Sequence, residues 1–93
     1  MNFKIEEIIG DILIEFNKAT LNYGEFNSPH EGYSIILEEL EELWIEIKKS
    51  PKNRDYILMR KEAIQLTAMS LRFIYDMDTM NLTCLRDKSK NGE

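Results

Sequence analysis

The sequence predicts an all-α protein, with about three long antiparallel helices in a four-helix-type bundle that oligomerisation completes. Apolar residues recur at helical spacing in three separate segments. Both prolines and two of the four glycines fall at the ends of these segments or outside them. The chain has 93 residues, which suits a single domain over 1–93 but buries only a modest fraction of its surface. A second copy is therefore expected to complete the core.

The first helix is expected over about residues 3–22, where apolar side chains face one side and acidic side chains the other. Gly10 lies inside this helix, at a cost of up to ~1 kcal/mol relative to alanine, and is expected to allow close helix packing. The helix is expected to end at Tyr23, with Gly24 in the left-handed conformation.

The second helix is expected over about residues 29–49. Ser28 is a favourable N-cap, Pro29 suits the first helical position, and Glu31 is placed to close a capping box. Two lysines in the last turn favour the helix dipole, and Pro51 prevents the helix from continuing.

An apolar stripe on this second helix is expected to face the core. It consists of Ile36, Leu37, Leu40, Leu43, Trp44 and Ile47. Beside the stripe, Glu39, Glu42 and Glu46 share a second arc of the helix. Carboxylates four residues apart repel each other, so this arrangement suggests that a cation, most economically a divalent metal ion, binds there.

The third helix is expected over about residues 54–78, and its apolar character from Ala63 to Met77 predicts burial on most sides. Its exceptions line up as a polar stripe, which must be satisfied by protein partners or by a ligand. The stripe consists of Glu62, Gln65, Arg72 and Asp76. After Asp78 the pattern fades: Met80, Leu82 and Leu85 suggest a short fourth helix or a docking tail, and 86–93 is expected to be a frayed tail.

Composition excludes several classes of function. The formal net charge of −5 argues against nucleic acid as the main partner. No apolar run approaches the length of a membrane span, and the N-terminus is too acidic for a signal peptide, so the cytoplasm is the expected compartment. Cys84 is the only cysteine, which rules out an internal disulfide and a cysteine-based zinc site. His30, the only histidine, is expected to have a capping or loop role.

The acidic residues suggest a magnesium site between two helices. Glu39 and Glu42 place two carboxylates on one helix face, and Glu62 and Gln65 have the same spacing on the third helix. If the two helices pack antiparallel, the four side chains converge as oxygen ligands suited to Mg²⁺, with Mn²⁺ as a substitute. The alternative is that the acidic stretch is only a solvated helix face.

The two motifs also resemble those of a known family. Glu38-Glu39-Leu40-Glu41-Glu42-Leu43, followed by Glu62-Ala63-Ile64-Gln65, is similar to the Glu-Glu-x-x-Glu … Glu-x-x-Asp signature of the MazG-like, all-α nucleoside triphosphate pyrophosphohydrolases. The resemblance covers about residues 23–77.

The resemblance implies helices that assemble into a homodimer or homotetramer, with Mg²⁺ held between the motif helices. It also implies hydrolysis of a nucleoside triphosphate to the monophosphate and pyrophosphate. Glu39, Glu42 and Glu62 would be metal ligands, and Glu38 a further ligand or a neighbour that orients them. We expect Glu38 to be the catalytic carboxylate that activates water.

Cationic and polar side chains near the site are expected to bind the substrate, and the candidates are Arg72, Asp76, Lys49 and Lys61. Gln65 departs from the pattern, because the family has aspartate there and glutamine offers only a neutral oxygen. A non-catalytic helical module that binds a nucleotide or a protein partner is therefore the first alternative. A helical assembly protein without a metal site is the second.

Overall fold

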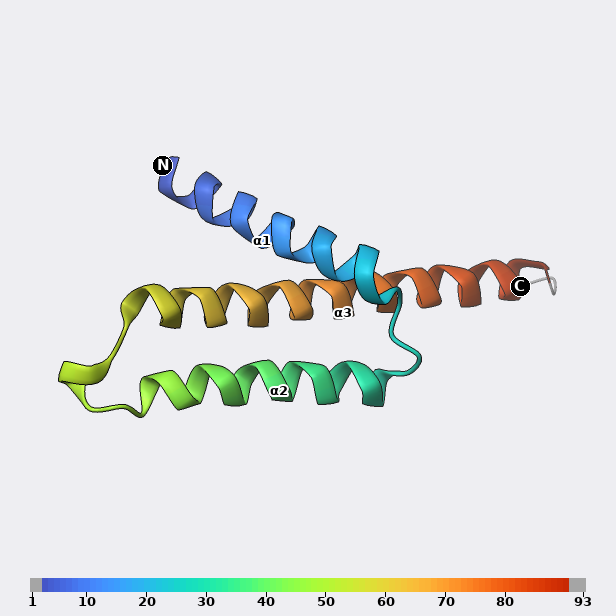
Figure 1. Ribbon diagram of the computed structural model, residues 1–93. Coiled ribbons are helices and arrows are strands. Elements are labelled where there is room, and N and C mark those ends of the chain that lie inside the picture. Colours follow the sequence, from blue (N-terminus) through green and yellow to red (C-terminus); the bar gives the residue numbers. More distant parts are fainter. Residues whose placement is uncertain (1–2, 91–93) are drawn as a thin grey trace.

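The computed structural model describes the backbone of residues 3–90 and the side chains of residues 4–79. Within these residues the protein is all-helical and has no strand, as predicted (Figure 1). Its elements are α1 (Phe3–Tyr23), α2 (Pro29–Ile47), the short 3₁₀ helix η1 (Pro51–Asn53) and α3 (Tyr56–Lys90).

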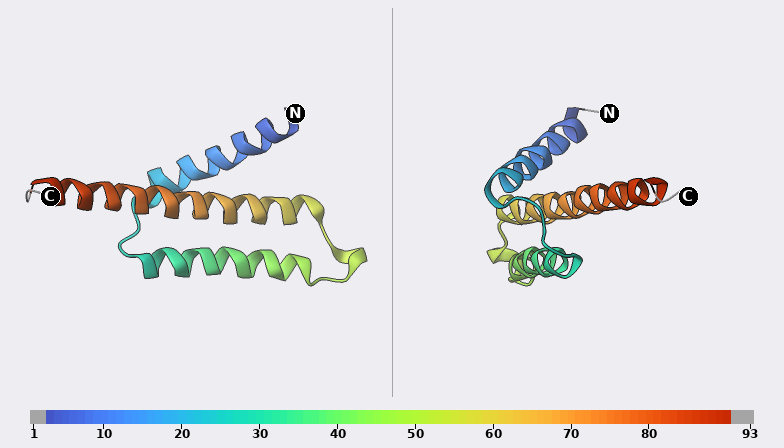
Figure 2. Two further views of the ribbon diagram at one scale, coloured as in Figure 1. Left: turned by 180° about the vertical axis from the view of Figure 1, so that it is seen from behind. Right: turned by 90° about the vertical axis from the view of Figure 1, so that its right-hand side faces the viewer.

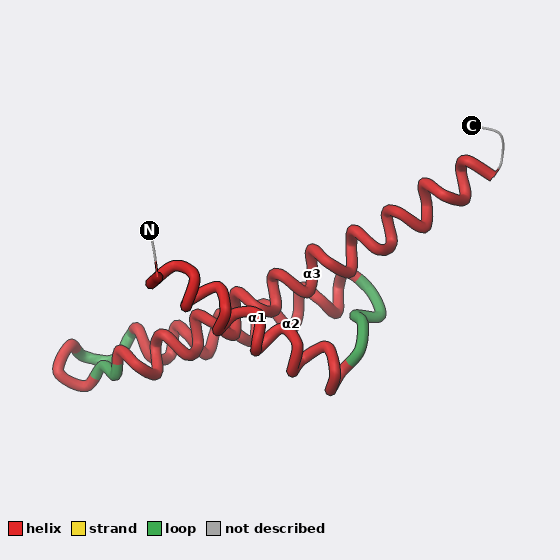
Figure 3. The backbone as a smooth tube through the Cα atoms, turned by 90° about the horizontal axis from the view of Figure 1, so that it is seen from above, coloured by secondary structure: helices red, strands yellow, loops and turns green. Residues whose placement is uncertain are grey.

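The helix α3 is the central element of the fold. It runs antiparallel to α2, to which η1 connects it, and the two helices form a hairpin (Figures 1 and 3). The helix α1 packs against the opposite side of α3 and diverges from it towards the N-terminus (Figure 2). Over the described residues, α1 and α2 do not pack against each other. None of these helices combines the length and the apolar character that a membrane crossing requires.

The connection between α1 and α2 is set largely as predicted. Gly24 has a φ of 69°, the left-handed conformation that ends α1. Ser28 caps α2 by accepting a hydrogen bond from the Glu31 backbone N–H at 3.2 Å. The Glu31 carboxylate, however, reaches past Ser28 and accepts from the backbone N–H of Asn27 at 2.6 Å. The predicted capping box is therefore shifted by one residue towards the loop.

The helix α3 is longer than predicted, because it continues without a break from Tyr56 to Lys90. The prediction of a separate fourth helix is wrong, because residues 80–85 belong to α3. Residues 86–90, expected to be part of a frayed tail, are also helical; the rest of that tail, 91–93, lies outside the described residues. The physical reason is the absence of a helix breaker, since Gly92 is the first glycine or proline after Pro51.

The core is small, and the two predicted apolar faces are only partly covered. Its buried apolar side chains are Ala19, Phe26, Ile64 and Ala68. On α2, Leu37, Leu40 and Trp44 remain exposed, so the predicted stripe faces α3 along only one edge. On α3, Ile74 and Tyr75 are each 57% exposed, which contradicts burial on most sides, because α1 diverges and α2 covers one flank.

The close helix approach occurs at Gly32 rather than at Gly10. A Cβ atom added to Gly10 would meet nothing within 4 Å, so the prediction for Gly10 is wrong. A Cβ atom on Gly32 would lie 2.6 Å from Cδ2 of Phe73 and 3.1 Å from Cδ2 of Phe26. The missing side chain at Gly32 thus lets the aromatic ring on α3 pack directly against the backbone of α2.

Candidate metal centre

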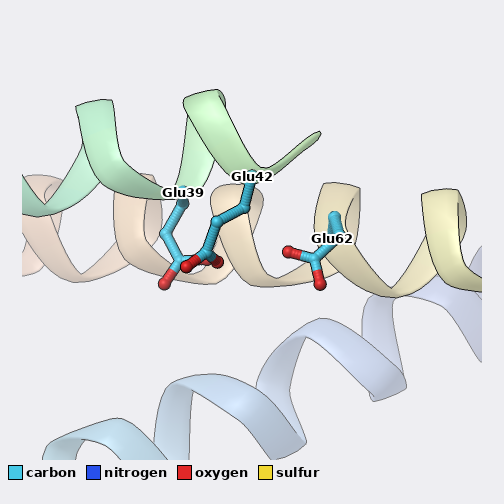
Figure 4. Close-up of side chains that lie close together, drawn as sticks. All are labelled: Glu39, Glu42 and Glu62. Carbon is cyan, nitrogen blue, oxygen red and sulfur yellow. The ribbon is translucent and has the colours of Figure 1, made fainter. Parts of the chain in front are cut away.

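Three glutamates from two helices meet in the α2–α3 hairpin. Glu39 and Glu42 lie one turn apart on α2, and the carboxylate of Glu62 on α3 points towards them (Figure 4). One carboxylate oxygen of each residue lies within 4.8 Å of the others. We call Glu39, Glu42 and Glu62 the acidic cluster. The antiparallel hairpin produces the acidic cluster because it sets the second half of α2 beside the first turns of α3, as the sequence predicts. The role of the acidic cluster in metal binding stays a prediction.

The acidic cluster contains oxygens that lack partners. Oε2 of Glu39 and Oε2 of Glu62 are buried, and each is without a hydrogen-bond partner among the described residues. Burial raises the pKa of Glu39 from its usual 4.5 to about 7, together with the negative charge of Glu42, a side-chain hydrogen bond with Glu42, and the charges of Glu62 and Glu38. Burial and then the charge of Glu42 also raise the pKa of Glu62. The cluster therefore holds more negative charge than its surroundings stabilise.

A divalent cation fits this donor set. Hard carboxylate oxygens are the ligands that Mg²⁺ and Mn²⁺ prefer. A cation among the three carboxylates would offset the repulsion that raises the pKa of Glu39 and would give the two buried oxygens a partner. Glu42 is exposed, which leaves room for the waters or phosphate oxygens that Mg²⁺ usually keeps in its coordination shell.

A cavity of about 670 Å³ lies beside the acidic cluster, between α1, the α1–α2 loop, α2 and α3. This volume is within the range of about 300–1,000 Å³ typical of small-molecule sites. The predicted residues among those that line it are Glu38, Glu39, Gln65 and Arg72. The cavity thus brings together the predicted catalytic carboxylate Glu38, two predicted metal ligands, Glu39 and Gln65, and one predicted substrate-binding cation, Arg72.

The two predicted substrate-binding lysines do not line this cavity. Lys49 forms an ion pair with Glu46 at 2.7 Å near the C-terminal end of α2. Glu46 therefore has a cation of its own and is not an additional free carboxylate for the acidic cluster. Lys61 is exposed and lines a separate cavity of about 240 Å³ between α1 and α3.

Arg72 and Asp76, the other two predicted substrate-binding residues, hold the α1–α2 loop. Both are buried on α3, with exposed fractions of 3% and 6%. Arg72 donates through Nη2 to the backbone carbonyl of Gly24, and its guanidinium lies 4.4 Å from the centroid of the Phe26 ring. Oδ2 of Asp76 accepts from the Phe26 backbone N–H at 3.0 Å. At this end of the polar stripe of α3, the polar side chains are thus satisfied by other groups of the protein. Contact with a substrate stays a prediction for both residues.

Sequence reasoning missed the contribution of α1 and of the loop to the cavity. The residues from this part of the chain that line it are Glu15, Lys18, Ala19, Asn22, Tyr23, Glu25, Phe26 and Asn27. One signal could have indicated the loop, because a buried arginine and aspartate on α3 require partners, and loop backbone groups are the commonest source.

Comparison of the chain with models of protein families, with curated proteins and with solved structures finds no match. The resemblance to the MazG-like family therefore stays a prediction from the two acidic motifs in the sequence.

Proposed function

We propose that this protein is a Mg²⁺-dependent nucleoside triphosphate pyrophosphohydrolase, with Mn²⁺ as a possible substitute. The observation that carries the proposal is the convergence of Glu39, Glu42 and Glu62 from two helices within 4.8 Å. The unpartnered oxygens of Glu39 and Glu62 and the raised pKa of Glu39 support it, because a divalent cation would offset both costs. In this proposal Glu39, Glu42 and Glu62 hold the ion, and Gln65 offers its neutral amide oxygen as a further ligand.

The reaction adds water across the bond between the α- and β-phosphates and gives a monophosphate and pyrophosphate. A divalent ion held by the cluster supplies charge neutralisation on the phosphate oxygens and a lower pKa for a bound water. Glu38 lines the cavity and is exposed, so in this proposal it accepts the proton of the attacking water. Arg72 and Lys18, which also line the cavity, place positive charge near the phosphates.

A second candidate is a non-catalytic module on the same scaffold, which binds a nucleotide or a protein partner without turnover. Two observations favour it. Gln65 stands where the resembled family has aspartate, so the site lacks one carboxylate. Arg72 and Asp76 are already engaged by the α1–α2 loop, which leaves fewer free polar groups for a substrate.

Assembly as a homodimer or homotetramer, with a four-helix-type bundle, is part of the proposal. It is supported by the exposed apolar side chains on α2 and by the small core of the single chain. Location in the cytoplasm and the absence of a nucleic-acid partner stay predictions from composition.

A hydrolysis screen tests the enzyme proposal. Pyrophosphate release from a panel of nucleoside triphosphates is measured with Mg²⁺ and with Mn²⁺, for the natural protein, Glu39→Gln and Gln65→Asp. We expect release that depends on the metal, is lost in Glu39→Gln and increases in Gln65→Asp. Nucleotide binding by calorimetry without release would favour the non-catalytic module. If the protein neither binds a nucleotide nor releases pyrophosphate, and Mg²⁺ leaves its melting temperature unchanged, the acidic cluster is only part of a solvated helix face.

A further inference from the structure

The α1–α2 loop is tied to α3 by two buried side chains of opposite charge. Arg72 donates to the backbone carbonyl of Gly24, and the Asp76 carboxylate accepts from the backbone N–H of Phe26 at 3.0 Å. These two backbone groups lie on either side of Glu25, which lines the large cavity. Arg72 and Asp76 together therefore fix this part of the cavity wall.

The two attachments of the loop differ in what can replace them. Arg72 lines the cavity, whereas Asp76 does not. Arg72 is 3% exposed and forms no ion pair with a carboxylate in the described part of the chain. Its partners are neutral, namely the Gly24 carbonyl, the Met69 sulfur and the Phe26 ring. Because a charged acceptor binds a guanidinium more strongly, and a phosphate group accepts two of its N–H groups at once, phosphate is the better partner for Arg72.

We propose that a nucleotide bound in the cavity takes Arg72 from the Gly24 carbonyl and so releases one side of the α1–α2 loop. A phosphate group of the nucleotide accepts the hydrogen bonds of the guanidinium, and the Gly24 carbonyl turns to water. The loop stays attached at Phe26, because the Asp76 carboxylate repels phosphate and keeps the Phe26 N–H. This inference rests on the nucleotide binding in the proposed function and deepens it, because it makes the position of the loop depend on the occupancy of the site.

The surroundings of the two attachment points favour release at Gly24 and not at Phe26. Gly24 is exposed, and a Cβ atom added to it would meet nothing within 4 Å. Its peptide group therefore has space to turn, and glycine tolerates more backbone conformations than other residues. Phe26 is 4% exposed and packs against the Phe73 ring, with 6.4 Å between the ring centroids. This packing keeps the Phe26 side of the loop in place while the Gly24 side moves.

The carboxylates of the cavity determine which phosphates reach Arg72. The lining contains five carboxylates and two cations. The carboxylates are those of Glu15, Glu25, Glu31, Glu38 and Glu39. They repel free phosphate, whereas Mg²⁺ in the acidic cluster would offset the charge of the phosphates that it binds. The exchange at Arg72 therefore requires a nucleotide with Mg²⁺, and inorganic phosphate alone leaves the loop attached.

Nuclear magnetic resonance of the isotopically labelled protein tests this inference. The probe is an α,β-methylene nucleoside triphosphate with Mg²⁺, which resists cleavage and is chosen from a panel by calorimetry. We expect the carbonyl carbon signal of Gly24 to shift. Hydrogen exchange of the Gly24 amide, which donates to the Thr20 carbonyl at 3.2 Å, should increase about fivefold, as the loss of one neighbouring hydrogen bond predicts. Exchange of the Phe26 amide should stay unchanged, and Mg²⁺ alone or inorganic phosphate alone should change neither residue.

A matched pair of variants sharpens the test. In Arg72→Met the Gly24 amide should exchange fast with and without the nucleotide, because the donor to the Gly24 carbonyl is missing. Arg60→Met removes an exposed arginine from the same helix and should respond like the natural protein. If Arg72→Met does not fold, the natural protein alone decides.

Two results overturn the inference and leave the proposed function standing. One is a nucleotide that binds in calorimetry but leaves the Gly24 signals unchanged. The other is a nucleotide that raises exchange at Gly24 and Phe26 alike, since the whole loop then detaches. If no nucleotide of the panel binds, the proposed function fails, and the inference fails with it.

Discussion

The polar stripe of α3 has two ends that differ in how their polar groups are satisfied. At the loop end, Arg72 and Asp76 are almost fully buried, and the α1–α2 loop supplies their partners. At the hairpin end, Glu62 meets Glu39 and Glu42, and two buried oxygens have no partner among the described residues. The same helix face therefore stabilises the fold at one end and, in our proposal, keeps binding capacity free at the other.

The largest effect is expected at the loop end, from Arg72→Met. This variant leaves the Gly24 carbonyl without its donor and removes the guanidinium from the Phe26 ring. We expect a loss of about 3 kcal/mol in the free energy of unfolding, measured by urea denaturation. Arg60→Met is the matched control, because the Arg60–Asp11 ion pair is exposed and should contribute no more than about 1 kcal/mol. Equal losses in the two variants would mean that the buried Arg72 contributes no more to stability than an exposed ion pair.

The second prediction tests how tightly the loop end is packed. Gly32→Ala places a methyl group 2.6 Å from Cδ2 of Phe73, so the ring must move, and we expect a loss of about 1–3 kcal/mol. Gly10→Ala meets nothing within 4 Å and should stabilise α1 by up to about 1 kcal/mol. Thermal unfolding of both variants measures the difference. A gain in both would mean that Phe73 accommodates the methyl group freely.

The third prediction concerns metal at the hairpin end. At a Mg²⁺ concentration ten times the Kd, the natural protein should gain about 1.4 kcal/mol in the free energy of unfolding. Glu42→Gln should lose this gain, because Glu42 belongs to the cluster. Glu41→Gln, one residue away on the same helix and also exposed, should keep it. Melting curves with and without Mg²⁺ measure the effect, and the same gain in both variants would rule out the cluster as the site.

The fourth prediction concerns pH in the absence of metal. The pKa of Glu39 is raised in the folded protein to about 7 from 4.5, so the folded state binds more protons than the unfolded state between these values. The raised pKa of Glu39 therefore adds to the stability of the folded protein. This stabilisation is complete below pH 4.5 and is lost as the pH rises through about 7. Glu39→Gln, which cannot ionise, should have a shallower loss of stability with pH over this window. An unchanged slope in this variant would assign the pH dependence to other groups.

Local signals in the sequence were sufficient for the boundary between α1 and α2 and for the convergence of the acidic cluster. Ser28 and Pro29 mark the start of α2, and Gly24 marks the end of α1. Glu39, Glu42 and Glu62 converge because helical spacing and an antiparallel hairpin follow from a short connection. Each of these predictions depends on residues close in sequence or on one pairing of neighbouring helices.

Features that depend on distant partners could not be predicted in the same way. The sequence indicated that Arg72 and Asp76 need partners, but Gly24 and Phe26 lie about 50 residues away. The role of Gly32 likewise depends on where the Phe73 ring lies in the folded protein. The far end of α3 was underestimated because fading periodicity does not stop a helix in the absence of glycine or proline.

One continuous helix carries both ends of the stripe, and this sets a length scale. Ten residues separate Glu62 from Arg72 on α3, which is about 15 Å at the rise of an α-helix. The interval cannot be shortened by a bend at a glycine or a proline, because α3 has neither. The backbone positions that carry the Glu62 carboxylate and the Arg72 guanidinium are therefore held about 15 Å apart along the helix axis, and only the reach of the side chains can shorten that interval.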